Sequence, residues 1–151
     1  MPAWTKYCAK SAPLLRVVFD TNVVIAHLRR QQLLPLRAVL PFAVVGELEA
    51  FALKADWGYQ KVAFLRQLLE RYPLVGFVPE LASLYARLDA YSQGKLRGQL
   101  LPAGMSARNM GKNDIWIAAT ALEVDMPLHS ADHDFDHLLP LGLQLVKELP
   151  W

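Results

Sequence analysis

The stretch Arg16-Val-Val-Phe-Asp-Thr-Asn-Val-Val24 decides the fold class of this chain. Apolar residues with high β-propensity run directly into Asp20, a pattern typical of a short, buried β-strand. Apolar residues at helical spacing follow at once, and any one of Asp20, Thr21 or Asn22 is able to cap that helix. A buried strand that passes straight into a helix predicts an α/β fold.

The same alternation of apolar runs and helical patterns continues to the end of the chain. A second strand is expected over 38–45, where Pro41 favours a strand start or an edge position, and Glu47 would then open the next helix. Later strands are expected at 74–78, 127–129 and 143–146, and helices at 61–72, from Pro79 and from Asn113-Asp114. These elements predict one α/β domain, residues 16–151, around a mainly parallel sheet.

The composition is that of a globular protein of one domain. The chain has 151 residues, of which 54% are hydrophobic and 20% charged, and this apolar content excludes a disordered protein. Cys8 is the only cysteine, which excludes an internal disulfide and a cysteine-based zinc site and favours a reducing compartment, so we expect a cytoplasmic protein. No apolar run is long enough for a membrane helix. Residues 1–15 are an expected N-terminal extension, with an organelle-targeting peptide as the alternative.

Four acids stand where a strand is expected to end or a helix to begin: Asp20, Glu47, Asp114 and Asp132. In an open parallel sheet, ligands bind beyond the carboxyl ends of the strands, so these side chains could converge there. Clustered carboxylates repel one another unless cations neutralise them, and oxygen ligands without cysteine favour Mg²⁺ or Mn²⁺. The pattern indicates a metal-dependent phosphodiesterase or phosphatase. Taken singly, each acid is also explained by helix capping, the helix dipole or a turn.

Four motifs resemble those of the PIN-domain ribonucleases, and most closely those of the VapC-type toxins of bacterial toxin–antitoxin pairs. In chain order they are Val17–Val24, Val44–Leu48, Gly111–Ala121 and Leu128–Phe135, of which the third is the strongest match. The resemblance implies a three-layer α/β/α fold and endonucleolytic cleavage of RNA by metal-activated water. It also implies a homodimer and a cognate antitoxin that blocks the active site.

The resemblance further implies roles for individual residues. Asp20 and Asp114 are expected to be primary metal ligands, and Glu47 and Asp132 to complete the site around one or two Mg²⁺ or Mn²⁺ ions. Residues beside these acids are expected to orient ligands or a phosphate by hydrogen bonding, with one further acid among them: Thr21, Asn22, Asn113, Ser130 and Asp134. Helix capping explains Asn113 equally well.

The segment from Ser92 to Lys112 is a long, basic, glycine-containing loop without acids. Arg108 and Lys112 within it are candidate contacts for RNA phosphates, although exposed loop cations commonly have no such role. Trp116 is a candidate for stacking on bases, with core packing as the alternative. The net charge of +2 is small for a nucleic-acid-binding protein, but without the four acids assigned to a metal site 16 basic residues face 10 acidic ones, a net of +6.

Other functions remain open at the level of sequence. A PIN-type nuclease could work in RNA maturation or decay without an antitoxin, and a PIN-like domain could be a catalytically silent binding module. The intact set of four acids argues against the silent module. A haloacid-dehalogenase-like phosphatase needs a second Asp two residues after its nucleophile, where this chain has Asn22. No glycine-rich phosphate loop precedes a Lys-Ser or Lys-Thr pair, which argues against an NTPase.

Overall fold

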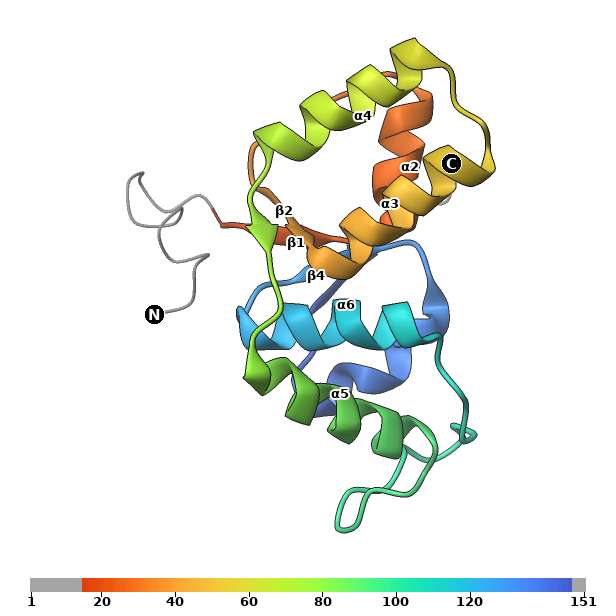
Figure 1. Cartoon of the computed structure of the whole chain (residues 1–151). Coiled ribbons are helices and arrows are strands. Elements are labelled where there is room, and N and C mark those ends of the chain that lie inside the picture. Colours follow the sequence, from red (N-terminus) through yellow and green to blue (C-terminus); the bar gives the residue numbers. More distant parts are fainter. Residues whose placement is uncertain (1–14, 148–151) are drawn as a thin grey trace.

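The structure, a computed structural model, describes residues 15–147 and is built on one five-stranded sheet (Figure 1). All neighbouring strands are parallel, in the order β3-β2-β1-β4-β5. The strands are β1 (Val17–Phe19), β2 (Ala38–Pro41), β3 (Leu74–Val75), β4 (Leu128–Ser130) and β5 (Leu145–Lys147). The predicted α/β fold with a parallel sheet is therefore confirmed. Residues 1–14 of the predicted extension, Cys8 among them, lie outside the described residues.

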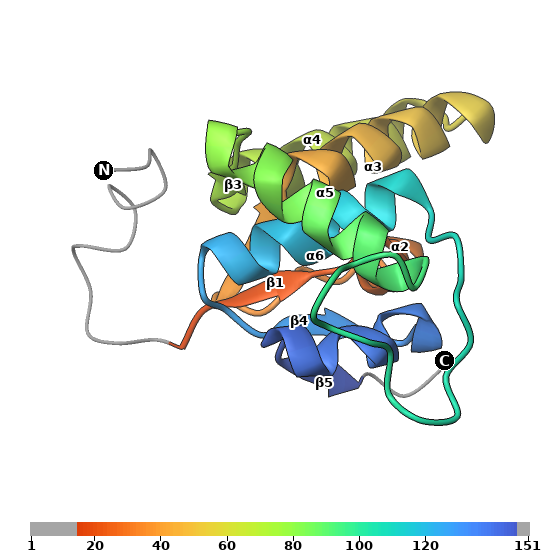
Figure 2. The ribbon, with the colours of Figure 1, turned by 90° about the horizontal axis from the view of Figure 1, so that it is seen from below.

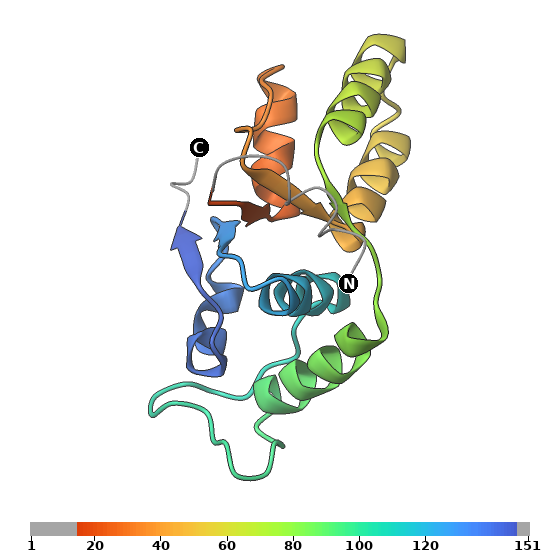
Figure 3. The same cartoon turned by 90° about the vertical axis from the view of Figure 1, so that its left-hand side faces the viewer.

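Helices flank the sheet on both sides, which confirms the expected three-layer architecture. They are α2 (Thr21–Arg29), α3 (Phe42–Lys54), α4 (Tyr59–Arg71), α5 (Pro79–Ser92), α6 (Lys112–Glu123) and the 3-10 helix η1 (His133–Leu141). In Figures 1 and 3, α2 lies on one side of the strands and α6 on the other, with α5 packed outside α6. None of the helices within residues 15–147 has the length and apolar character needed to cross a lipid bilayer.

The second strand is shorter than the sequence predicts. β2 ends at Pro41 and α3 begins at Phe42, so the expected strand over 38–45 is wrong in its second half, and Glu47 lies inside α3 instead of opening a helix. Pro41 cannot donate a further ladder hydrogen bond, and Val44 and Leu48 bury one face of the helix that follows it. The expected strand-start or edge position for Pro41 is also wrong, because it ends a strand that lies between β1 and β3.

The core forms around β1, which is buried on both faces. Val18 and Phe19 are 0% and 1% exposed, and burial of each such side chain contributes about 1.5–3 kcal/mol. On α6, Ala118 and Ala119 are fully buried, and their small side chains let the helix approach its neighbours closely. The strand order reverses between β1 and β4, and in such sheets that reversal opens a crevice beyond the carboxyl ends of the two strands.

Ser92, at the start of the long loop between α5 and α6, makes a buried contact with η1 and a hydrogen bond to the far end of the loop. The loop extends away from the α5–α6 pair in Figure 2. Ser92 ends α5, and its Oγ lies 2.8 Å from Nε2 of His137 in η1, within hydrogen-bond distance. The ring of Tyr91 stacks on that imidazole with the ring centroids 6.2 Å apart. The backbone N–H of Arg108 donates to the carbonyl oxygen of Ser92 at 2.8 Å, so the last part of the loop is held next to the end of α5.

Candidate active site

Asp20 follows β1 directly, at the carboxyl edge of the sheet. It is 3% exposed, and its Oδ1 accepts a hydrogen bond of 2.7 Å from the backbone N–H of Thr21, so Asp20 is the residue that caps α2. Its second oxygen, Oδ2, accepts a hydrogen bond of 2.7 Å from the hydroxyl of Ser130. Ser130 ends β4, the strand beside β1, so the sheet itself brings these two residues together. Capping and a place in the site are compatible roles for Asp20.

Asp132 lies two residues beyond Ser130 and belongs to the same hydrogen-bonded group. Its backbone N–H donates to the Ser130 hydroxyl at 3.0 Å. Its carboxylate Oδ1 accepts from the backbone N–H of Asp134 at 2.9 Å and so caps η1. Asp134 is exposed next to it, whereas Asp136 binds His133 and Lys147.

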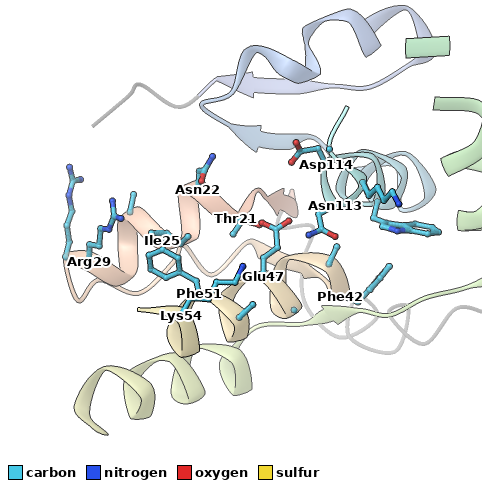
Figure 4. A pocket seen from close by; sticks show the side chains of 18 residues that line it. Thr21, Asn22, Ile25, Arg29, Phe42, Glu47, Phe51, Lys54, Asn113 and Asp114 are labelled. Atoms are coloured by element: carbon cyan, nitrogen blue, oxygen red, sulfur yellow. The ribbon is translucent and has the colours of Figure 1, made fainter. Parts of the chain in front are cut away.

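A groove of about 1280 Å³ opens beside these residues, between α2, α3 and the first turn of α6 (Figure 4). Six of the predicted site residues line it: Thr21, Asn22, Glu47, Lys112, Asn113 and Asp114. Figure 4 shows the carboxylates of Glu47 and Asp114 directed into the same space from α3 and α6. Although Glu47 does not open a helix as predicted, its position one turn inside α3 still directs it into the groove.

The acids share an electrostatic environment. Burial raises the pKa of Asp114 to about 6, and the negative charges of Asp20, Glu47, Asp132 and Asp134 add to the rise. Burial also raises the pKa of Asp20, against the hydrogen bonds from Ser130 and Thr21 that favour the carboxylate. The structure thus brings together the four acids singled out in the sequence, with Asp134 at their margin.

The donor set fits a hard divalent cation in chemistry. The side chains that meet here offer carboxylate and hydroxyl oxygens, the ligand atoms of Mg²⁺ and Mn²⁺, and their mutual repulsion is what a cation relieves. Within residues 15–147, no three His, Cys, Asp or Glu side chains already surround a common point at which a metal would sit. A cation bound to one or two of these carboxylates would complete its shell with water.

Two features of the site were not predicted from the sequence. A Cβ at Gly111 would lie 3.0 Å from Oδ2 of Asp114, so the glycine leaves room for that carboxylate. The buried hydroxyl of Thr21 has no hydrogen-bond partner among the described residues, although it lines the groove. Gly111 also occupies the cap position of α6, so the expectation that Asn113 caps this helix is wrong. The free hydroxyl and the glycine both point to a ligand beside the carboxylates.

Of the two residues predicted to contact RNA phosphates, one lines the groove and the other does not. Lys112 is exposed and lines the groove. Arg108 is not among the lining residues, and its charge acts on His137 instead. Three further cations line the groove beside Glu47 and Asp114, and none of them was predicted from the sequence to belong to the site: Arg29, Arg30 and Lys54. Helical spacing could have identified two of them. Lys54 lies seven residues after Glu47, and Arg29 lies seven residues after Asn22, so each cation shares a helix face with a predicted site residue.

Comparison with known proteins agrees with this geometry. The model of the PIN domain family matches residues 17–138. The fold is similar to VapBC2 from Rickettsia felis, solved with a DNA fragment from its promoter (16% identity, TM-score 0.65, 87% of this chain and 97% of that one). It is also similar to VapBC-1 from nontypeable Haemophilus influenzae (24%, TM-score 0.62, 87% and 96%). VapBC-5 from Mycobacterium tuberculosis, a toxin–antitoxin system, gives 24% identity and a TM-score of 0.64 over 89% and 100% of the two chains.

No curated protein matches the chain at the level of its sequence. The structural likenesses lie below 25% identity and concern the fold alone. The family model, in contrast, spans all four motifs through the first part of η1. PIN domains are in general nucleases, which hydrolyse phosphodiester bonds. This chain belongs to the PIN domain family.

Proposed function

We propose that this protein is a metal-dependent endoribonuclease and the toxin of a toxin–antitoxin pair. The observation that carries the nuclease proposal is the convergence of Asp20, Glu47, Asp114 and Asp132 at one edge of a PIN-type sheet. Four acids from four separated segments have no structural need to meet, since Glu47 and Asp114 do not cap their helices. Glu47 and Asp114 line the open groove, which an extended substrate can enter.

In this proposal Asp20 and Asp114 hold one or two Mg²⁺ or Mn²⁺ ions, with Glu47 and Asp132 completing the ligand set. A bound cation would supply charge neutralisation and a more acidic water for attack on phosphorus. The hydroxyl of Ser130 and the backbone N–H of Thr21 fix the two oxygens of Asp20, so its carboxylate is oriented before substrate arrives. In hydrolysis the water oxygen bonds to phosphorus, the bond to the leaving ribose oxygen breaks, and a carboxylate of the cluster accepts the water's proton.

The toxin proposal also includes partners. Three of the solved structures similar to this fold are VapBC assemblies, one of them named as a toxin–antitoxin system. By that likeness we propose a cognate antitoxin, a homodimer and a cytoplasmic location for this chain. The fold supports the antitoxin through its likeness to these assemblies, while the acid cluster supports the catalysis independently.

Purified full-length protein tests the catalysis. We expect it to cleave single-stranded RNA with Mg²⁺ or Mn²⁺, and to lose this activity in EDTA. Asp20→Asn and Asp114→Asn should each abolish cleavage, because each removes a charge from the cluster. Asp125→Asn is the matched control, since Asp125 is exposed beyond the end of α6. Cleavage that survives EDTA, or equal activity in all four proteins, refutes the proposal.

A growth experiment tests the toxin role. Induction of the wild-type chain alone should arrest bacterial growth, and Asp114→Asn should relieve the arrest at equal protein level. If the purified wild type cleaves RNA in a metal-dependent manner but its induction leaves growth unchanged, the protein is a nuclease of RNA maturation or decay and not a toxin.

A further inference from the structure

Asp132 lies in a turn whose backbone is held from both sides by other parts of the chain. On one side, its backbone N–H donates to the hydroxyl of Ser130, the last residue of β4. On the other side, its backbone carbonyl oxygen accepts a hydrogen bond of 2.5 Å from Nζ of Lys147, the last residue of β5. Lys147 pairs with Ser130 in the parallel ladder, so the two groups that hold Asp132 stand opposite each other on neighbouring strands.

Lys147 also binds a second residue near this turn. Its ammonium forms a salt bridge with Oδ1 of Asp136, and the other oxygen of that carboxylate lies 3.0 Å from Nδ1 of His133. An ammonium has three donors, so one Lys147 side chain can hold the Asp132 carbonyl and the Asp136 carboxylate at the same time. Lys147 therefore ties η1 to the capping residue that precedes it.

The salt bridge separates Asp136 from the acids of the site. The negative charges that raise the pKa of Asp114 include those of Asp132 and Asp134 but not that of Asp136. The side chains of Lys147 and Asp136 are each 38% exposed, and an ion pair at the surface contributes little to the stability of a fold. The main effect of Lys147 is therefore local, on the turn that carries Asp132.

We propose that Lys147 is a positioning residue for the metal-binding acids: its ammonium holds the Asp132 backbone and the Asp136 carboxylate together, and this fixes the direction of the Asp132 carboxylate. This inference rests on the proposed metal-dependent nuclease function and adds a residue of the last strand to it. The N–H, the carbonyl oxygen and Oδ1 of Asp132 are all engaged, so the residue has little freedom to turn away from the other acids. Groups that orient a metal ligand in this way raise the affinity for the metal.

The charge of Lys147 alone predicts the opposite effect on metal binding. Removal of a positive charge beside a cluster of carboxylates strengthens the attraction of that cluster for a divalent cation. Loss of the two contacts made by Lys147 instead frees the turn and weakens binding. Lys147→Met removes the ammonium and keeps a side chain of similar length, so the sign of its effect on metal affinity distinguishes the two roles.

Titration of the full-length protein with Mn²⁺ in the absence of RNA measures this affinity, with electron paramagnetic resonance reporting free Mn²⁺. Lys147→Met should weaken Mn²⁺ binding about tenfold or more, the effect of removing a group that orients a metal ligand. Lys147→Arg keeps the charge and several donors and should restore most of the affinity. Lys61→Met is the matched control, since Lys61 is exposed on α4 and does not line the groove. Circular dichroism verifies that each variant is folded.

Asp136→Ala provides a second test of the same contacts. It should weaken Mn²⁺ binding less than Lys147→Met does, because the hydrogen bond from Lys147 to the Asp132 carbonyl remains. In the double variant, the loss of binding free energy should be smaller than the sum of the two single losses, since both changes break the same salt bridge. Fully additive losses would mean that the two residues act independently, which refutes the proposal.

The outcomes separate this inference from the nuclease proposal. If Lys147→Met binds Mn²⁺ as tightly as wild type or more tightly, the positioning role is refuted. If it then also raises the KM for RNA, Lys147 contacts the substrate instead. Failure of this inference alone leaves Mn²⁺ binding sensitive to Asp114→Asn but not to Lys147→Met. Failure of the nuclease proposal differs, because wild type itself would neither bind Mn²⁺ nor cleave RNA.

Discussion

The hydroxyl of Ser130 donates a 2.7 Å hydrogen bond to Oδ2 of Asp20, and this bond joins residues 110 positions apart in the chain. Both residues are buried at the ends of neighbouring parallel strands. The bond favours the ionised form of Asp20 in surroundings whose burial favours the protonated one. Because the same hydroxyl accepts from the backbone of Asp132, Ser130 sets the relative position of two of the four acids.

Ser130→Ala should therefore impair both catalysis and folding. Loss of the hydroxyl leaves one Asp20 oxygen without a partner, so we expect cleavage to fall about 10- to 100-fold, as for other residues that orient metal ligands. Unfolding free energy should fall by about 1–3 kcal/mol, because the hydroxyl's hydrogen bonds to Asp20 and to the backbone of Asp132 are both lost. Steady-state RNA cleavage and urea denaturation measure the two effects. Ser130→Thr keeps the hydroxyl, and equal losses in both variants would mean that size and not hydrogen bonding matters.

Asp114→Asn should stabilise the metal-free protein. The pKa of Asp114 is raised from its ordinary value near 3.8 to about 6, so the folded chain binds more protons than the unfolded chain between these values. The stability that this carboxyl contributes is present below about pH 4 and is lost as the pH rises through about 6. Removing the charge should then raise stability near neutral pH by the order of 1 kcal/mol, about 2–4 °C in Tm, after allowance for solvent screening.

Thermal denaturation in EDTA at several pH values checks this expectation. The advantage of Asp114→Asn over wild type should shrink as the pH falls toward 4. Added Mg²⁺ or Mn²⁺ should raise the Tm of wild type more than that of the variant, since a ligand stabilises the state that binds it. An equal response of both proteins to the cation would argue against Asp114 as a metal ligand.

Gly111→Ala tests the room left for the Asp114 carboxylate. The new Cβ would lie 3.0 Å from Oδ2 of Asp114, so the carboxylate must rotate or the start of α6 must shift. We expect RNA cleavage to fall about tenfold or more, because small displacements at a reacting centre are costly, with little change in Tm. Gly58→Ala is the control, since a Cβ there meets no heavy atom within 4 Å. Unchanged cleavage in Gly111→Ala would show that Asp114 does not need its present position.

His137 should make the fold sensitive to mild acid. Burial, followed by the positive charge of Arg108, lowers its pKa below the ordinary value near 6.5. The unfolded chain therefore binds more protons in this range, and the contribution of His137 to stability is lost as the pH falls below about 6.5 toward the lower folded value. Urea denaturation should show a steeper loss between about pH 7 and 5 in wild type than in His137→Gln. Equal slopes in wild type and His137→Gln would show that His137 does not cause this sensitivity.

The sequence predicted the fold class and the meeting of the acids because both depend on local patterns. A buried run that ends at Asp20 places that acid at the strand edge whatever the rest of the chain does. The sequence placed the start of the helix that carries Glu47 too late. This error moved the boundary between β2 and α3 but did not change the face of α3 on which Glu47 lies, so Glu47 still reaches the site. Such predictions tolerate errors in element boundaries.

Two features could not be predicted from the sequence: the basic part of the groove, formed by Arg29 and Lys54, and the space that Gly111 leaves for the Asp114 carboxylate. Whether Arg29 and Lys54 face one another depends on how α2 and α3 lie relative to each other, which no spacing within either helix determines. The contact of Arg108 with RNA phosphate stays a prediction. The structure shows that its backbone N–H donates to the carbonyl oxygen of Ser92 and that its charge lowers the pKa of His137.

The hydrogen bond between Ser130 at the end of β4 and Asp20 at the end of β1 also has a consequence for the order in which the chain is synthesised. Asp20 is synthesised before β4, which ends at Ser130, so β1 has no β4 to pair with until residues 128–130 have been made. A nascent or truncated chain that ends before residue 128 contains the strand, α3 and the helix of Asp114, yet lacks half of the hydrogen bonds that fix Asp20. Chain fragments that end before β4 should therefore fail to assemble the complete group of acids.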